Sequence, residues 1–181
     1  MSSVVISGNT SGSVSLVAPD VAGSSVQTLA SVSGTLAPLV SGTAVTASGT
    51  SVDFTGIPSW AKRITVLFDG VSLNGASQIL VQLGDSGGIE NTGYVGGSAT
   101  TSATTGFQVL LNLASRTTTG LVTIMNLNNN LWIASGSTWN TVEVSSLAGS
   151  KSLSATLDRV RITTVNGTDT FDAGTINIMY E

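Results

Sequence analysis

Two pairs of carboxylates stand close enough along the chain to suggest acid–base chemistry. Asp85 and Glu90 are separated by Ser-Gly-Gly-Ile, and Asp169 and Asp172 by Thr-Phe. Paired carboxylates hydrolyse glycosidic bonds when their separation and pKa values suit that reaction, and carboxylate oxygens also suit a calcium ion. Neither pair has EF-hand spacing, and Asp followed by Gly is typical of a plain turn. We therefore expect no enzyme, no catalytic residue, no cofactor and no assigned metal site, with a loop calcium ion left as an open alternative.

Aromatic residues could form a second kind of site, a platform on which a sugar ring stacks. Tyr94 lies in a Gly-rich segment, Trp132 follows an Asn-rich turn, and Trp139 lies among Ser, Thr and Asn. An apolar platform with a few well-placed polar groups is the general form of a ligand site, so Tyr94, Trp132 and Trp139 are the glycan-binding candidates. The alternative is that Trp132 packs in the core and Trp139 caps a sheet edge, because large aromatic side chains dominate core burial. For Trp60, at the entrance to a strand, packing is the expected role.

The elements that would position these residues are β-strands. Nine segments from residue 51 onward are rich in Val, Ile, Leu and Thr and are separated by turn residues. They are residues 51–54, 62–68, 77–84, 107–113, 121–127, 131–135, 141–145, 157–164 and 175–180. Ile64, Val66 and Phe68 alternate with their neighbours, as in a strand with one buried face. The pattern predicts an all-β fold, an antiparallel β-sandwich of jelly-roll type. Asp69-Gly70 and residues 93–97 are expected in turns or loops, and residues 144–149 are the one possible short helix.

The first 45 residues differ from the remainder. They hold no aromatic residue, no basic residue and a single acid, Asp20. Their apolar residues come in four short pieces, 4–6, 14–17, 26–29 and 36–40. Exposed strands of this kind are stable only when they pair with something else. Residues 1–45 are therefore expected to form an extended N-terminal arm for attachment or intertwining, and residues 46–181 a β-sandwich domain.

Composition narrows the classes of function. Charged residues make up only 9% of the chain and hydrophobic residues 41%, while Ser (27) and Thr (25) are abundant. Disorder requires low hydrophobicity and high net charge, so the chain should fold with a hydroxyl-rich, nearly uncharged surface. Six basic residues without a stripe exclude a nucleic-acid footprint, and no apolar run reaches the roughly 18–20 residues of a membrane span. The absence of histidine and cysteine removes the commonest general base and all thiol chemistry.

Two longer segments carry a resemblance to a known group of proteins. Residues 52–66 (VDFTGIPSWAKRITV) and 168–181 (TDTFDAGTINIMYE) resemble a module of tailed-bacteriophage virion proteins of the tail-fibre type. Residues 7–14 (SGNTSGSV) and 18–23 (APDVAG) are similar to the start of many phage fibres. The resemblance implies a β-sandwich that assembles as a homotrimer, with residues 1–45 docked to other virion proteins. It points to no catalytic residue.

Three functions follow as expectations. The first is a short tail fibre or tail appendage that binds host-surface polysaccharide through Tyr94, Trp132 or Trp139. The second is a capsid-decorating or cementing protein with a purely structural role, whose arm pairs with a neighbour by strand addition. The third is an enzyme that cleaves surface polysaccharide with one of the carboxylate pairs. Residues 1–10 lack the features of a secretory signal, so synthesis in the host cytoplasm and a final location in the virion are expected.

Overall fold

The computed structural model describes residues 3–7, 13–17, 38–98, 101–111 and 113–181. The chain separates into two units, Met1–Leu36 and Ala37–Glu181, and each is described by itself. In the first unit, strands β1 (Ser3–Ser7) and β2 (Ser13–Val17) form an antiparallel hairpin. The apolar pieces 4–6 and 14–17 thus lie in strands that pair with each other, whereas piece 26–29 and the start of piece 36–40 lie outside the described residues.

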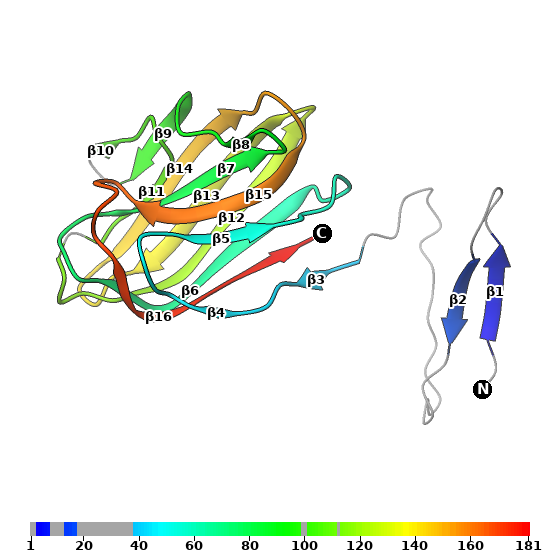
Figure 1. Ribbon diagram of the computed structural model, residues 1–181, viewed down its shortest axis with the longest axis horizontal. Helices are drawn as coiled ribbons and strands as arrows, with labels where there is room; N and C mark the ends of the chain where they lie inside the picture. Colours follow the sequence, from blue (N-terminus) through cyan, green and yellow to red (C-terminus); the bar gives the residue numbers. More distant parts are fainter. Residues whose placement is uncertain (1–2, 8–12, 18–37, 99–100, 112) are drawn as a thin grey trace. The chain divides into compact units, whose positions relative to one another are not determined.

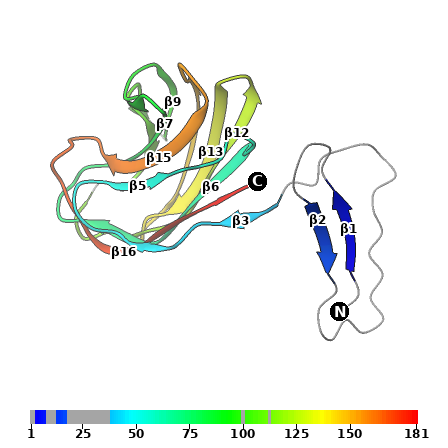
Figure 2. The same cartoon turned by 45° about the vertical axis from the view of Figure 1, so that its right-hand side comes forward.

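The second unit is an antiparallel β-sandwich, which confirms the predicted fold class (Figures 1 and 2). The larger sheet has nine strands, in the order β10 (Thr101–Ser102), β9 (Tyr94–Ser98), β14 (Val144–Ser152), β13 (Leu131–Trp139), β12 (Thr118–Asn128), β6 (Arg63–Leu73), β16 (Phe171–Tyr180) and β3 (Val40–Ser41), with β4 (Val45–Thr46) also paired to β16. The smaller sheet has five strands, in the order β11 (Phe107–Val109), β7 (Ile79–Asp85), β15 (Leu157–Thr164) and β5 (Val52–Thr55), with β8 (Gly88–Ile89) paired to β7. Consecutive strands β12, β13 and β14 form a meander in the larger sheet.

Period-two alternation accounts for the core between the two sheets. On β6, Ile64, Val66 and Phe68 are at most 3% exposed, and Leu83 on β7 and Ile162 on β15 meet them from the facing sheet as fully buried residues of the same cluster. Burial of each such side chain contributes roughly 1.5–3 kcal/mol to folding. The hydrophobic contacts between the two sheets therefore determine which face of these strands points into the core. The opposite face of each strand points away from the core.

Seven of the nine predicted strands match observed strands closely. Among its described residues, segment 107–113 is strand only over Phe107–Val109, and segment 141–145 is strand only at its last two residues, where β14 begins.

Three further local predictions were wrong. Residues 93–97, expected as a loop, contribute most of strand β9. Residues 144–149, the possible helix, form the start of β14. Asp69-Gly70, expected as a turn, lies inside β6, where Gly70 has a φ of 60° and the pairing with β16 is irregular. In each case pairing with neighbouring strands overrides the local preference of glycine or of helix-forming residues.

The boundary between arm and sandwich also differs from the expected position after residue 45. Strands β3 and β4 both pair with β16, so residues 40–46 belong to the larger sheet. Composition placed the boundary later because this stretch lacks aromatic and basic residues, whereas backbone pairing decides membership of a sheet.

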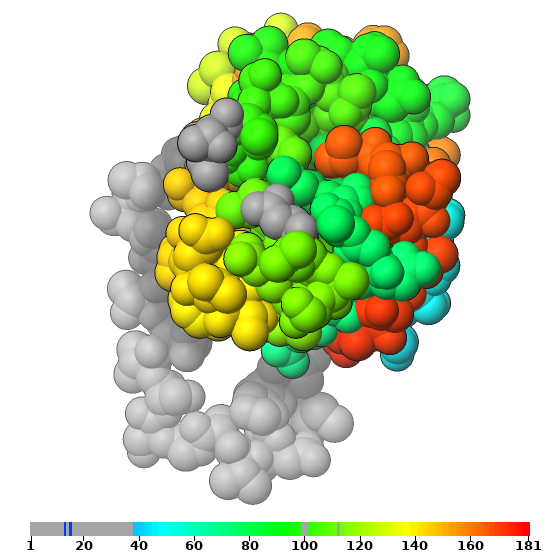
Figure 3. All heavy atoms as spheres, turned by 90° about the vertical axis from the view of Figure 1, so that its left-hand side faces the viewer, coloured from blue at the N-terminus to red at the C-terminus, as the bar shows by residue number. Residues whose placement is uncertain are grey.

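Turns at one end of the sandwich are tied together. The Thr117 N–H donates to Thr141 Oγ1 at 2.9 Å, and that hydroxyl donates to the Thr117 carbonyl at 3.1 Å. Arg116 and Glu143 form an ion pair at 3.5 Å beside them. Figure 3 shows this end of the molecule, where the yellow-green and yellow segments that hold these residues lie side by side. The contacts hold the β13–β14 hairpin in place.

Candidate functional site

Tyr94 lies within the core. Its ring is 2% exposed and packs edge-on against Phe107, with 5.1 Å between ring centroids. Its hydroxyl accepts a hydrogen bond from the Leu83 N–H at 2.6 Å and donates to the Glu90 carbonyl at 3.0 Å. Burial raises the pKa of Tyr94, so the phenol stays neutral. Because no ring face is open to a sugar, the prediction of Tyr94 as a glycan platform is corrected: Tyr94 is a core residue.

Trp132 and Trp139 point to opposite faces of the same strand. They are seven residues apart in β13, and an odd separation in a strand reverses the side-chain direction. Trp132 is 4% exposed and belongs to the core cluster, so it too is corrected from glycan candidate to core residue. Trp139 is 47% exposed and lies opposite Val144 on β14. Of the three predicted aromatic residues, only Trp139 therefore offers ring surface, and the three do not converge on one site.

Asp85 and Glu90 are brought together by Ser154. The Ser154 hydroxyl donates to Asp85 Oδ2 at 2.8 Å, and the Ser154 N–H donates to Glu90 Oε1 at 2.7 Å. Lys151, only 4% exposed, forms an ion pair with Glu90 and lies 5.5 Å from the centroid of the Tyr94 ring. The cluster ties the β8–β9 connection to the β14–β15 connection, which is a structural role.

The charge state of this cluster does not suit glycoside hydrolysis. Hydrogen bonds from the Ser154 hydroxyl and the Gly87 N–H hold the pKa of Asp85 below its ordinary value. Burial raises the pKa of Glu90, but the hydrogen bond from Lys151 and the contacts with Ser154 outweigh that effect and lower the pKa overall. A general acid in such an enzyme needs a raised pKa. Both carboxylates here are ionised at neutral pH.

Asp169 and Asp172 hold two different segments. Asp169 Oδ2 accepts from the Ser77 N–H at 2.9 Å, while Asp172 accepts from the Ser72 hydroxyl. Asn166 Oδ1 accepts from the Asp169 N–H at 3.0 Å and closes the turn after β15. These are the contacts of turn residues. Among the residues that the structure describes, no three side chains of metal-binding type lie close enough to hold a metal ion.

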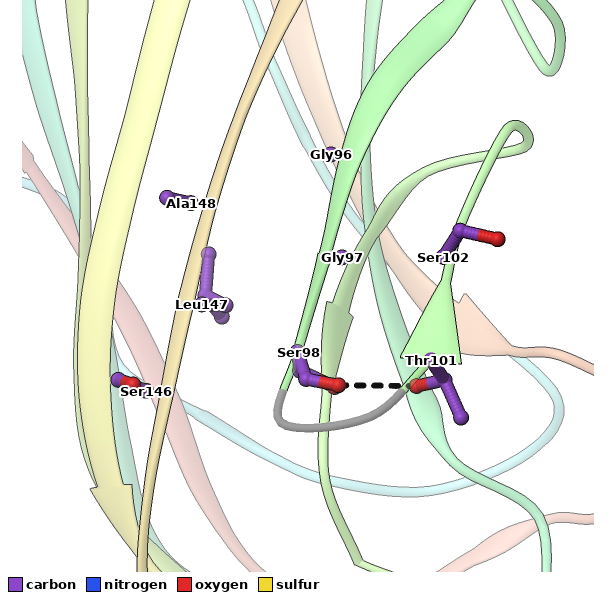
Figure 4. A pocket seen from close by; sticks show the side chains of 8 residues that line it. All are labelled: Gly96, Gly97, Ser98, Thr101, Ser102, Ser146, Leu147 and Ala148. Carbon is purple, nitrogen blue, oxygen red and sulfur yellow. Dashed lines mark hydrogen bonds between the residues drawn. The ribbon is translucent and has the colours of Figure 1, made fainter.

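A hollow of about 640 Å³ lies where β9 and β10 meet β14 (Figure 4). Its lining residues are Gly96, Gly97, Ser98, Thr101, Ser102, Ser146, Leu147 and Ala148. The Thr101 hydroxyl donates to the Ser98 carbonyl at 3.0 Å and to Gln108 Oε1 at 2.9 Å, so its one donor is used within the protein. A Cβ on Gly96 would lie 2.3 Å from the Ala148 carbonyl oxygen, so glycine there permits close strand packing. None of these lining residues is charged or aromatic, which leaves little to select a ligand.

A second depression lies beside Trp60, the tryptophan that the sequence assigned to packing. Trp60 is 43% exposed, and its ring lies 5.7 Å from that of Tyr180 at an angle of 50°. A hydrogen bond of 2.9 Å from the Ala61 N–H to the Pro58 carbonyl closes the turn that carries it. The depression measures about 540 Å³ and is lined by Trp60, Lys62, Arg63, Met125, Asn126 and Glu181. It combines an exposed aromatic ring with charged and amide groups.

A third candidate surface is the side of strands β9, β14, β13 and β12 that faces away from the core, here named the outer face. It is made by alternate residues of each strand. These are Val95 and Gly97 on β9, and Val144, Ser146, Ala148, Ser150 and Ser152 on β14. On β13 they are Leu131, Ile133, Ser135, Ser137 and Trp139, and on β12 they are Thr119, Leu121, Thr123, Met125 and Leu127. None of these residues carries a charge. Leu121 is 43% exposed, Met125 45% and Val144 68%. The register places Met125 beside Ile133 and Trp139 beside Val144, so apolar side chains adjoin across strands.

The sequence of β12 already indicates an apolar outer face, although the prediction of strands made no use of this pattern. Residues 121, 122, 124, 125 and 127 of β12 are all apolar, so both faces of this strand are apolar. Near-continuous apolar strands are typical of sheets that are covered on both sides. In β12 only Val122 and Ile124 of these five are buried within the chain. The remaining three are exposed.

No helix in the described part of the chain has the length and apolar character needed to cross a bilayer.

Comparisons with known proteins do not assign this chain to a family. A scan against protein-family models, a search of curated proteins and a search of solved structures each found no match.

Proposed function

We propose that this chain is a non-enzymatic structural protein of a bacteriophage particle and that its sandwich unit assembles as a homo-oligomer through the outer face. The likeness of residues 52–66 and 168–181 to tail-fibre modules supports the phage part of the proposal. The uncharged outer face with its exposed apolar side chains is the observation that carries the assembly part.

The two outward sides of the sandwich differ in a way that supports this proposal. On the five-stranded sheet, Arg161 forms two hydrogen bonds of 2.7 Å with Asp53, and Arg159 pairs with Asp158. Such charged pairs are usual where a sheet faces water. The outer face of the nine-stranded sheet lacks any counterpart on β9, β14, β13 and β12. This difference between the two outward sides supports a role of the outer face in contact with protein.

The outer face would supply most of one side of a standard protein interface. Its four neighbouring strands at roughly 4.8 Å spacing and up to about nine residues of length span about 19 Å by 30 Å, or about 570 Å². A standard protein interface buries about 800 Å² on each partner. A second copy of this chain is the occupant we propose, because an uncharged face offers no complement to a charged partner and leaves no charge unpaired when another uncharged surface covers it. The tail-fibre likeness implies that the assembly is a trimer. In a trimer each outer face would contact its two neighbours through different parts of its surface, because pairing of identical patches closes as a dimer.

The test is a matched pair of threonine substitutions. Thr123 lies midway along β12 on the outer face, between Thr65 and Ser135, and Thr55 is exposed on the opposite sheet. Thr123→Glu would bury a charge in each copy of the interface, at a cost of several kcal/mol per copy, whereas Thr55→Glu would not. We expect sedimentation velocity to give a trimer for wild type and Thr55→Glu, and monomer for a Thr123→Glu protein with an unchanged β-sheet spectrum. A monomeric wild type, or a trimeric Thr123→Glu protein, would contradict the proposal.

Two places on the particle are compatible with this assembly. The first is a short tail fibre or tail appendage that binds host-surface glycan, and the alternative is a capsid-decorating protein with a purely structural role. In both, the N-terminal unit would attach the protein to other virion proteins. Immunogold labelling of intact particles distinguishes them, because label at the tail tip supports the fibre and label over the head supports the decorating protein. Label on neither would contradict a role in the virion.

A further inference from the structure

The depression beside Trp60 is the feature of the described residues in which an exposed aromatic ring and hydrogen-bonding groups meet. Tyr180 supports the indole ring, and 43% of Trp60 remains exposed. Support from a second ring holds the platform in one orientation, so a ligand that stacks on it does not have to order it first.

The polar groups around Trp60 are also held in place. Asn126 Nδ2 donates to the Asn129 carbonyl at 2.9 Å and to the Leu131 carbonyl at 3.4 Å. Both bonds use the amide nitrogen, so the Asn126 side-chain oxygen is the atom left to accept from a ligand hydroxyl. Arg63 and Glu181 form an ion pair on the same rim, which supplies further donors and acceptors.

Lys62 differs from the other basic residues in its ion pairing. The chain has six basic residues, and five of them pair with a carboxylate within the described residues: Arg63, Arg116, Lys151, Arg159 and Arg161. Lys62 is exposed and has no carboxylate within 4.0 Å in that part of the chain. Lys62, the basic residue for which the described part of the chain offers no such partner, thus lies on the rim of a depression that contains an exposed tryptophan.

We propose that this depression binds an acidic saccharide, with a sugar ring stacked on Trp60 and a carboxylate of the saccharide beside Lys62. The apolar face of a pyranose ring covers an exposed indole, while its hydroxyls bond to fixed polar groups at the edge. Asn126 Oδ1 and the carboxylate of Glu181 accept from hydroxyls, and the guanidinium of Arg63 donates to ring or hydroxyl oxygens. A uronate or sialate residue provides both a ring that stacks on Trp60 and a carboxylate that pairs with Lys62, whereas a neutral sugar leaves Lys62 without a counter-ion.

The inference gives a ligand class to the host-binding part of the proposed function, but it does not rest on self-association. Trp60 lies in the turn before β6, and the depression opens at the margin of the outer face, where Met125 is the shared residue. Binding measured in solution with a single-site saccharide is independent of copy number, so failure of the assembly proposal and failure of this one give different results.

The experiment uses the full chain and a panel of uronate- and sialate-bearing oligosaccharides, each with a neutral counterpart that lacks the carboxylate. Isothermal titration calorimetry follows binding to wild type, Trp60→Ala, Trp60→Phe, Lys62→Gln and the distant control Val165→Ala. We expect at least one acidic saccharide to bind wild type and Val165→Ala equally. Trp60→Ala should weaken that binding about tenfold or more, and Trp60→Phe less, because phenylalanine retains an aromatic face. Lys62→Gln should weaken the acidic ligand about threefold and leave any neutral ligand unchanged.

Three results would overturn the proposal. The first is that wild type binds no acidic member of the panel. The second is that a bound saccharide keeps its affinity in Trp60→Ala. The third is that Trp60→Ala, with its β-sheet spectrum intact, changes the oligomeric state in sedimentation, because the depression would then be part of the contact between copies.

Discussion

Tyr94→Phe tests how the buried polar groups of the sandwich are satisfied. On one side of β7, strand β11 pairs only as far as Val81 and strand β8 pairs only from Gly84 onward, so Leu83 lies in the gap between these two partners. At Leu83 the Tyr94 hydroxyl takes the place of a strand, accepting the N–H at 2.6 Å, and the Leu83 carbonyl accepts from the Glu90 N–H at 3.0 Å. Removal of the hydroxyl leaves the Leu83 N–H without that acceptor in a residue that is fully buried.

The expected cost follows from that geometry. A buried donor without a partner costs about 1–3 kcal/mol, and the ring contacts of Tyr94 are retained in phenylalanine, so we expect a loss of about 2 kcal/mol in the free energy of unfolding. For a unit of this length about 1 kcal/mol corresponds to roughly 4 °C, which gives a fall in Tm of about 8 °C. Tyr180→Phe is the matched control, since no described hydrogen bond involves its hydroxyl, and it should change stability by less than about 0.5 kcal/mol. Urea unfolding that gives Tyr94→Phe the stability of wild type would refute the role of the hydroxyl.

Two further predictions concern charged groups of the sandwich. Lys151→Met should destabilise the protein by about 2–3 kcal/mol in urea unfolding, which is less than the loss of a fully buried pair because the Glu90 side chain stays 22% exposed. Arg161→Met removes a pair whose side chains are 37% and 40% exposed, so it should cost less than about 1 kcal/mol. Equal losses in the two variants would contradict this difference between a buried and an exposed ion pair. Asp85 and Glu90 have pKa values below their ordinary values of 3.8 and 4.5, so their stabilisation is complete above about pH 4.5 and is lost as the pH falls further through the folded-state values. Thermal melts between pH 7 and pH 3 should show this loss of stability. Ser154→Ala should make the loss smaller, because the hydrogen bond from Ser154 is the main cause of the lowered pKa of Asp85. An unchanged pH dependence in that variant would contradict this role of Ser154.

Much of the fold could be predicted because its determinants are local. Alternation at Ile64, Val66 and Phe68 identifies the buried face of β6 without knowledge of its neighbours. The same reasoning failed for residues 93–97, where glycine suggested a loop. Gly96 lies in β9 with its Cα against Ala148, and a side chain there would collide with the β14 backbone. The strand therefore needs glycine because of tertiary packing, which no local rule registers.

The candidate site was harder to predict because burial depends on which strands become neighbours. Strand parity shows that Trp132 and Trp139 must point to opposite faces, but the sequence does not say which face meets the second sheet. Trp60 was assigned to packing because it precedes a strand, yet the turn at Pro58 directs it outward with Tyr180 as its support. A prediction of sugar-stacking residues from aromatic type alone therefore selected two core residues and passed over an exposed one.

The placement of charge connects the low charged content of the chain to its proposed assembly. A monomer with few charged residues could spread them evenly to keep every surface soluble. Here the pairs made by Arg159 and Arg161 lie on the smaller sheet, and Arg116 and Glu143 pair in the turns at the end of the sandwich. The pair of Arg63 with Glu181 marks the margin of the outer face. The scarce charges thus surround an uncharged area rather than interrupt it, and this distribution is what the proposed contact between copies requires. Thr123→Glu would add to the outer face the kind of charge that a solvent-facing sheet carries.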